Sequence, residues 1–315
     1  MKIIIASTHC SRTDLIEYQF KSIKKFVKND YDYYVFNDAT QEARLINFNN
    51  PNIRQEIRDT CSKLNINCID IPQNIHKDRQ ILFPNTKEFN VENAVTRCAD
   101  STQYLYNYFK DTNQIIVIID SDMFFIKHVD IVNDILNDNV IAYIGQAKGN
   151  DVAYMWNGFL VYNLEKMINC KNLNFDCGNI NGEPVDVGGH THFWLQENKH
   201  LNKKILGCFH IPTKTALQNY EFIYPTYIQE YFNNVAELNQ NDIINKELIA
   251  NDIILHMRGA GGNWDYANSS FKKYLSKKYN NKHIHYDILN KEWKNFQFEH
   301  GALVGKFLDN IITIL

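Results

Sequence analysis

Two aspartates at the end of an apolar run are the residues of this sequence with the clearest capacity for chemistry. Asp120 and Asp122 follow five consecutive β-branched residues at 115–119, a run typical of a buried strand. At a strand end, side chains two residues apart project to the same side. Buried carboxylates are costly unless a divalent cation or hydrogen bonds compensate their charge. The pattern therefore predicts a metal site, with a turn or a helix cap as the alternative.

A histidine beside a Gly-rich segment is a further residue able to ligate a metal. His256 follows the apolar residues 253–255 and precedes the glycines Gly259 and Gly262. A neutral imidazole and two carboxylates form a mixed nitrogen and oxygen donor set that suits Mn²⁺. Glycines also let backbone N–H groups approach a phosphate closely. A core histidine satisfied by hydrogen bonds is the alternative for His256.

Two segments between these candidates carry polar residues beside glycines. Asn157 stands before a glycine and an apolar run, so its amide can bond sugar hydroxyls or serve as a turn residue that opens a strand. Asp186 precedes a Gly-Gly pair, and its carboxylate can bond sugar hydroxyls or face the anomeric carbon. His190 and His192 are alternative zinc ligands if they lie on a strand, because alternate residues of a strand face one way.

The order of apolar patterns indicates which elements position these residues. Apolar runs bounded by turn residues predict strands at 3–7, 33–37, 68–71, 115–119, 141–144, 159–162 and 253–257. Helical spacing of apolar residues predicts helices over 13–27 and 91–109. This alternation predicts an α/β sheet whose ligand lies at the carboxyl ends of the strands. We expect a loop at 169–183 and a docked C-terminal helix at 303–315.

Composition excludes several classes of protein. The 315 residues are 44% hydrophobic and 22% charged, which supports a large core and excludes dominant disorder. The net charge of -3 provides no strong field for nucleic acid or an anionic membrane. Seven cysteines without a Cys-x-x-Cys pair predict reduced thiols in a cytosol-like compartment. Since no apolar run resembles a signal peptide or reaches membrane-span length, we expect a cytoplasmic protein.

Together these segments resemble the GT-A glycosyltransferases, and among them the glycogenin-like enzymes. In that family an Asp-x-Asp pair ends a central strand, and a downstream pattern reads His-x-x-Gly-x-x-Lys-Pro-Trp. His256, Gly259 and Trp264 stand at the matching spacing. Gly262 occupies the Lys position, which removes a side chain expected to touch phosphate, and Arg258 is a candidate substitute.

The resemblance implies a fold and a domain organisation. The fold is the Rossmann-like GT-A fold, an α/β architecture with a mixed, mostly parallel central sheet flanked by helices in a single large domain. The catalytic domain would span 1–265, divided into a nucleotide-binding half at 1–125 and an acceptor and metal half at 126–265. A C-terminal helical extension at 266–315 would pack on it.

The resemblance also assigns residues to the nucleotide sugar. In the family, the base and ribose lie against the ends of the first two strands, which here carry Thr8 and Asp38. Asp38 can accept the uracil N–H and Thr8 can donate to its carbonyl, with helix capping as the alternative for Asp38. Asn93 and Arg97 can reach the donor sugar or phosphate from one helix face, with a surface ion pair as the alternative for Arg97. The full set expected to bind the nucleotide sugar is Thr8, Asp38, Asn93, Arg97, Ser121, Gly259 and Gly262.

The implied activity is that of a metal-dependent glycosyltransferase. Asp120, Asp122 and His256 would hold Mn²⁺ or Mg²⁺ as a Lewis acid on the diphosphate leaving group, and Asp186 and Asn157 are the expected catalytic residues. A sugar would move from a UDP-linked donor to a hydroxyl of a glycan, a protein or a small molecule, with retention of configuration. An inverting reaction with Asp186 as the general base stays open. So do a metal-dependent nucleotidyltransferase and a non-catalytic carbohydrate-binding relative.

Overall fold

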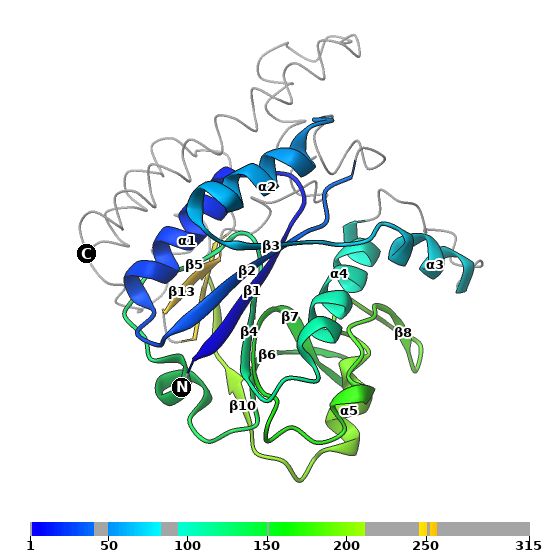
Figure 1. Cartoon of the computed structure of the whole chain (residues 1–315). Coiled ribbons are helices and arrows are strands. Elements are labelled where there is room, and N and C mark those ends of the chain that lie inside the picture. The colour runs from blue at the N-terminus through cyan, green and yellow to red at the C-terminus, as the bar shows by residue number, and fades with distance from the viewer. Residues whose placement is uncertain are drawn as a thin grey trace, which may run out of the picture.

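A seven-stranded sheet forms the centre of the computed structural model, which describes residues 2–40, 50–82, 94–149, 151–211, 246–250 and 253–256 (Figure 1). Its strands are β1 (Ile3–His9), β2 (Tyr31–Asn37), β3 (Asn67–Asp70), β4 (Ile115–Ile119), β6 (Ile141–Lys148), β7 (Val152–Asn163) and β10 (Lys203–Leu206). Their order is β10-β6-β7-β4-β1-β2-β3, and neighbours run parallel except where β7 pairs with β4 and β6. This mixed, mostly parallel sheet, flanked by helices, confirms the predicted fold class.

Helices cover both faces of the sheet. They are α1 (Asp14–Phe26), α2 (Ile53–Leu64), α3 (Asn74–Leu82), α4 (Ala94–Phe109) and α5 (Thr191–Glu197), with a short π-helix at Ile131–Leu136. Figure 1 shows α1 and α2 on one face of the sheet and α4 and α5 on the other. The strands β4 and β1 in the middle of the sheet are therefore buried on both faces, which explains why their sequences are largely apolar.

The core divides at the sheet according to the two-residue period of the strands. Ile3 and Ile5 of β1 pack into the cluster to which α1 and α2 contribute, while Ile4 and Ala6 pack into the cluster to which α4 and α5 contribute. The residues of β4 alternate between the two clusters in the same way. The carboxyl end of β4 is thus held rigidly between two apolar layers, directly before Asp120.

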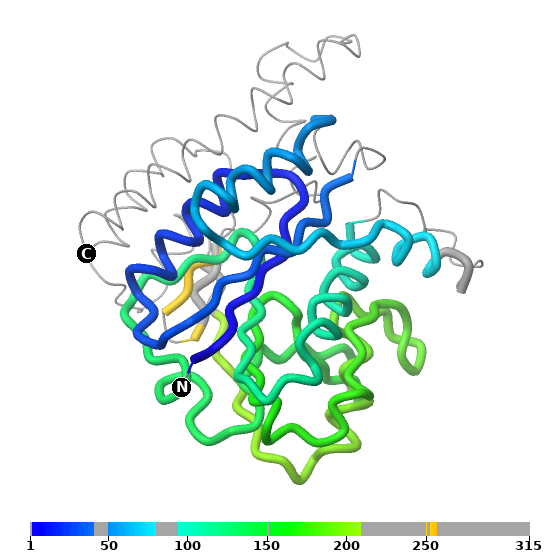
Figure 2. The backbone as a smooth tube through the Cα atoms, viewed as in Figure 1, coloured from blue at the N-terminus to red at the C-terminus, as the bar shows by residue number. Residues whose placement is uncertain are grey.

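A second, antiparallel sheet connects the segment after β4 with a distant part of the chain. It contains β11 (Cys208–Ile211), β12 (Lys246–Ile249), β13 (Ile254–His256) and β5 (Met123–Phe125) in that order. In the register of the β13 and β5 pair, His256 lies opposite Met123. Figures 1 and 2 show β13 beside β5 and close to α1. This pairing brings His256 next to the two aspartates.

Two sequence expectations need correction. The expected loop at 169–183 contains a 3₁₀ turn (Cys170–Asn172) and β8 (Gly178–Ile180), which pairs with β9 (Glu183–Val185). Asn181 and Gly182 join these strands with positive φ angles of 54° and 88°, the Asn-Gly signature of a tight hairpin turn. The strand expected at 159–162 is part of the much longer β7, because a register shift lets the polar residues before it remain in the sheet.

Other expectations concern segments outside the description. The segment 303–315, residues 91–93 of the expected second helix and the extension at 266–315 lie outside the described residues. The proposed division at 1–125, 126–265 and 266–315 stays a prediction.

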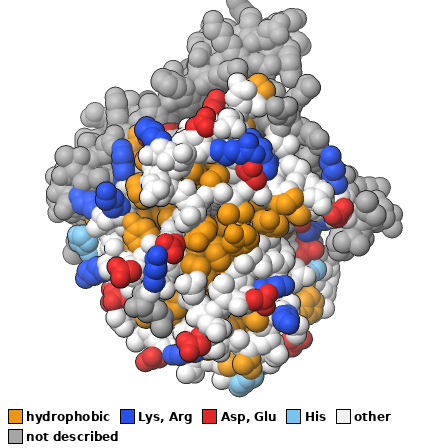
Figure 3. Space-filling model, in the orientation of Figure 1, with side chains coloured by type: hydrophobic (Ala, Val, Ile, Leu, Met, Phe, Trp, Pro, Cys, Tyr) orange, Lys and Arg blue, Asp and Glu red, His pale blue; other side chains and the backbone are white. Residues whose placement is uncertain are grey.

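The visible surface carries no large region of one charge. In Figure 3 a band of hydrophobic side chains crosses the middle of the face, and basic and acidic side chains surround it. Among the described residues, none of the helices combines the length and the apolar character needed to cross a membrane.

Candidate metal and nucleotide site

Asp120, Asp122 and His256 come together at the carboxyl end of β4. One ligand atom from each residue lies within 4.8 Å of the others. Nε2 of His256 is 3.3 Å from Oδ1 of Asp122, and both residues are buried while Asp120 is partly exposed. The structure thus unites the three residues that the sequence suggested as ligands. That they bind a metal ion stays a prediction.

The electrostatics of this cluster favour a cation. Burial raises the pKa of Asp120, the charge of Asp122 adds to this shift and His256 opposes it, and the resulting pKa is about 7. The two carboxylates therefore repel each other, and because they are largely removed from water, solvent screens this repulsion poorly. Two carboxylates and an imidazole at this spacing form a donor set that fits Mn²⁺ or Mg²⁺, since a divalent charge would relieve the repulsion.

A bulge in β7 places Asn157 beside the aspartates. The register of β6 and β7 shifts between Tyr143 and Ile144, and the N–H of Asp120 donates to the carbonyl of Gly158 at 2.8 Å. The side-chain amide of Asn157 is buried and lies 3.2 Å from Sγ of Cys98. Asn157 is therefore an interior strand residue, and the expectation that it opens a strand as a turn residue is wrong.

Gly158 and Trp156 of β7 pack beside His256. A Cβ on Gly158 would lie 2.4 Å from the ring of Trp156, so this position has room only for glycine. The Trp156 ring centroid is 5.2 Å from that of His256. The indole thus lies against the candidate ligand, at the point where β7 approaches β13.

Cys98 of α4 belongs to the same site, although nothing in the sequence pattern singled it out. Burial raises the pKa of its thiol well above the usual value, and the charges of Asp120 and Asp186 add to the effect. Cys98 therefore remains a neutral thiol among two carboxylates and the Asn157 amide. The periodicity of α4 predicted a helix, but it gave no signal for which face borders the site.

Asp186 directly follows β9, and a turn at 187–190 leads from it into α5. The carboxylate of Asp186 accepts the backbone N–H of Val187 at 2.8 Å, and the residue is partly exposed. His192 lies within α5 with Nδ1 2.9 Å from the carbonyl of Ala153, and His190 precedes the helix. Residues two apart in a helix do not share a face. The strand geometry behind the zinc alternative for His190 and His192 is therefore wrong.

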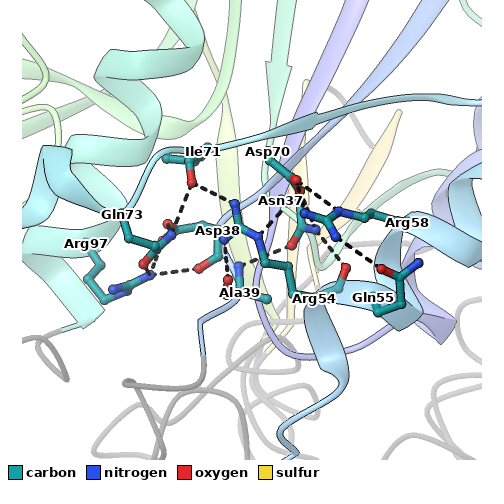
Figure 4. A network of polar contacts seen from close by, with 10 residues as sticks. All are labelled: Asn37, Asp38, Ala39, Arg54, Gln55, Arg58, Asp70, Ile71, Gln73 and Arg97. Carbon is teal, nitrogen blue, oxygen red and sulfur yellow. Dashed lines mark hydrogen bonds and ion pairs between the residues drawn. The ribbon is translucent and has the colours of Figure 1, made fainter.

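Arg97 and Asp38 form a buried ion pair at the carboxyl end of β2. Nη2 of Arg97 is 2.9 Å from Oδ2 of Asp38 and also donates to the Asp38 carbonyl at 2.7 Å (Figure 4). Arg97 is only 3% exposed, so the alternative of a surface ion pair is wrong. Its Nε and Nη1 are buried and have no hydrogen-bond partner in the described part of the chain. Buried donors of this kind usually serve a ligand or a water.

His76 of α3 connects this ion pair with α4. Its Nε2 is 2.9 Å from Oδ1 of Asp38, and its Nδ1 is 3.0 Å from Oδ2 of Asp100, which also pairs with Arg79. Burial alone would lower the pKa of His76, but the bonds to Asp100 and Asp38 outweigh it and the pKa is raised. Burial would likewise raise the pKa of Asp38, yet the bond from His76 and the charge of Arg97 lower it. His76 is thus an imidazolium that donates to two carboxylates.

Arginines of α2 fasten the ends of the neighbouring strands. Arg54 donates from Nη1 to the carbonyl of Ala39 at 2.6 Å and from Nη2 to that of Ile71 at 3.0 Å (Figure 4). Arg58 pairs with Asp70 at the end of β3. These contacts join α2 to the polypeptide that leaves β2 and β3, so the backbone around Asp38 is fixed from two sides.

The remaining sequence candidates divide between described and undescribed residues. Thr8 near the end of β1 and Ser121 between the two aspartates are partly exposed. Asn93, Gly259 and Gly262, together with Arg258 and Trp264, lie outside the described residues. The roles of all these residues toward a nucleotide sugar stay predictions.

Several glycosyltransferases of known structure are similar to this chain. The crystal structure of mouse xyloside xylosyltransferase 1 in its apo form matches with a TM-score of 0.37 and 10% identity, over 65% of this chain and 85% of that one. The galactosyltransferase LgtC, in complex with donor and acceptor sugar analogs, matches with a TM-score of 0.32 and 15% identity, over 64% of this chain and 66% of that one. The apo form of the glycosyltransferase GlyE of Streptococcus pneumoniae TIGR4 matches with a TM-score of 0.35 and 12% identity, over 94% of this chain and 64% of that one.

The chain thus spans slightly less than two thirds of LgtC and of GlyE. No protein-family model matches the sequence, and no curated protein is similar enough in sequence to count as a relative. The function of this chain is therefore inferred from its own residues.

We predict that Mn²⁺ binding weakens about tenfold between pH 8 and pH 6, because Asp120 must release a proton with a pKa of about 7 before it can ligate. The same shift makes the metal-free folded protein bind this proton more strongly than the unfolded chain does. Its free energy of unfolding should therefore fall as the pH rises from about 4 to about 7. Isothermal titration with Mn²⁺ between pH 6 and pH 8 measures the change in affinity. An affinity independent of pH would contradict the assignment of Asp120 as a ligand.

We predict that His76→Gln destabilises the protein by about 3 kcal/mol at pH 6, because it leaves two buried carboxylates without their shared donor. Since the pKa of His76 is raised on folding, its contribution is complete below the unfolded pKa of about 6.5 and is lost as the pH rises through the folded pKa. Urea unfolding at pH 6 and pH 9 should show a smaller difference from wild type at the higher pH. The exposed His200→Gln is the matched control and should change stability by less than about 0.5 kcal/mol.

Proposed function

We propose that this chain is a metal-dependent glycosyltransferase that moves a sugar from a UDP-linked donor to a hydroxyl acceptor on a glycan, a protein or a small molecule. The observation that supports this most strongly is the meeting of Asp120, Asp122 and His256, whose ligand atoms lie within 4.8 Å of each other. They lie at the carboxyl end of a parallel strand, where open α/β sheets bind their ligands. The cluster fits a divalent cation, and a diphosphate is the substrate group that such a cation binds most readily.

We propose that Arg97 supplies a further positive charge for the diphosphate. Arg97 has two buried nitrogen atoms without a partner in the described residues, and the next residue, Cys98, lies close enough to Asp120 for its thiol pKa to respond to that charge. A guanidinium in this state suits phosphate oxygens, which it binds in a bidentate manner. The chain as a whole has a net charge of -3, so we expect the positive field for a diphosphate to come from local groups, and we propose Arg97 and the cation.

The residues beside the cluster suit the sugar of the donor. When bound, the cation would neutralise the charge that develops on the diphosphate as the glycosidic bond breaks. Asp186 is partly exposed, and its charge influences Asp120, so its carboxylate faces the same space. We propose that Asp186 and Asn157 orient the donor sugar through its hydroxyls. Retention of configuration stays a prediction of the family resemblance.

We predict that the protein hydrolyses a UDP-sugar slowly in the presence of Mn²⁺ and not in the presence of a chelator. A panel of UDP-, GDP- and CDP-sugars, followed by release of the nucleoside diphosphate, measures this activity. Asp122→Ala should reduce it at least about 100-fold with an unchanged circular dichroism spectrum, because it removes a ligand. Asp111→Ala on the exposed turn after α4 is the control and should retain full activity.

Three results would contradict the proposal. Hydrolysis that resists the chelator would exclude the metal site, and binding of a nucleotide sugar without any turnover would indicate a non-catalytic carbohydrate-binding protein. Release of pyrophosphate from a nucleoside triphosphate would indicate a nucleotidyltransferase instead.

We predict that Arg97→Lys weakens the binding of UDP in the presence of Mn²⁺ by about 10- to 100-fold. Lysine keeps the charge beside Asp38 but loses the planar fork that donates to two oxygens at once, and bonds between charged groups contribute about 1.5–3 kcal/mol. Arg58→Lys is the matched control, because Arg58 also pairs with an aspartate at a strand end but is 44% exposed. Isothermal titration with UDP measures both variants, and equal affinities for Arg97→Lys and wild type would remove Arg97 from the site.

A further inference from the structure

A buried glutamine connects helix α1 with the turn that carries both aspartates. Nε2 of Gln19 donates to the carbonyl of Asp120 at 2.7 Å and to the carbonyl of Met123 at 2.9 Å. Gln19 is completely buried. The two carbonyls lie on either side of Ser121 and Asp122, so a single side chain holds both ends of the turn.

The chemistry of its partners fixes the orientation of the Gln19 amide. Backbone carbonyls only accept hydrogen bonds, so the group that faces Asp120 and Met123 must be the NH₂. Oε1 on the other side accepts the hydroxyl of Tyr33 at 2.6 Å and lies 3.3 Å from Nε2 of His9. The amide therefore has hydrogen-bond partners on both sides, in a place that excludes water. The carboxamide of glutamine can donate on one side and accept on the other.

A second contact joins the same helix to the strand after the turn. Ser22 donates from Oγ to the carbonyl of Gln19 at 2.9 Å and accepts the N–H of Phe125 at 3.3 Å. Phe125 belongs to β5, which pairs with the strand that ends in His256. Helix α1 thus fixes the turn and β5 together, and through β5 it determines where the turn stands relative to His256.

We infer that Gln19 is a positioning residue of the metal site, because it holds the Asp-x-Asp turn in its ligating conformation before a cation arrives. Asp120 and Asp122 repel each other, and a free turn would relax by moving them apart. A turn that is already fastened avoids that ordering cost when the cation binds, which is the general reason why groups outside the ligand set affect metal affinity. Since this role concerns the cation, it rests on the proposed function.

The test compares Mn²⁺ affinities of variants that keep the size of the side chain. Gln19→Glu replaces the NH₂ with an oxygen that faces two carbonyls, and Gln19→Met fills the space without hydrogen bonds. Titration of Mn²⁺ alone, with free ion followed by electron paramagnetic resonance, should show about 10- to 100-fold weaker binding for both. Folded variants whose dissociation constants lie within twofold of wild type would overturn the inference.

A matched control separates positioning from general stability. Gln103 of α4 also bonds backbone groups on both sides, with Nε2 3.3 Å from the carbonyl of Leu173 and Oε1 2.9 Å from the nitrogen of Phe175. Gln103→Glu should lower the melting temperature while Mn²⁺ affinity stays within twofold of wild type. Equal losses of affinity in Gln103→Glu and the Gln19 variants would reduce Gln19 to a structural residue.

A measurement on the unaltered protein covers the case in which the variants fail to fold. Hydrogen exchange of the segment 120–123 should already be slow in the metal-free protein and should change little when Mn²⁺ is added. A segment that exchanges freely until Mn²⁺ binds would overturn the inference. If wild type binds no Mn²⁺, the proposed function fails as well. If wild type and the Gln19 variants bind Mn²⁺ equally tightly, only the positioning role of Gln19 is contradicted.

Discussion

Repulsion between two carboxylates at the end of β4 is the constraint on which the rest of the site depends. Burial and the charge of Asp122 together raise the pKa of Asp120 to about 7, and among the described residues His256 is the group of the cluster that opposes this shift. Such an arrangement is unfavourable unless the fold enforces it. The apolar layers on both sides of β4 hold the strand end, and the pairing of β5 with β13 delivers His256. This arrangement is the reason why we propose a divalent cation as the partner of the two carboxylates.

A separate network at the ends of β2 and β3 complements the cluster. Asp38 is occupied by His76 and Arg97, so its main effect is to fix the Arg97 guanidinium. Because the charges of this network are buried and mutually bonded, Arg97 keeps its place while two of its nitrogens stay free of partners within the described residues. In the proposed function, this guanidinium and a divalent cation held by the cluster together match the charge of a diphosphate.

The sequence predicted the parts of this arrangement that depend on local pattern. The run at 115–119 and the aspartates after it were predictable because strand periodicity and burial act over a few residues. The β8 and β9 hairpin was missed although Asn181 and Gly182 signal it, because the surrounding residues are polar. The partners of His76 could not be predicted, since Asp38 and Asp100 come from separate elements and only the folded chain brings them together. The same holds for Gln19, whose spacing in α1 suggests nothing more than a helix face.

Anomalous diffraction from crystals grown with Mn²⁺ and UDP tests the central claim most directly. The account predicts a manganese peak between the side chains of Asp120, Asp122 and His256, with the diphosphate of UDP in contact with the ion and with Arg97. A manganese peak elsewhere, or UDP bound away from the carboxyl end of β4, would contradict it.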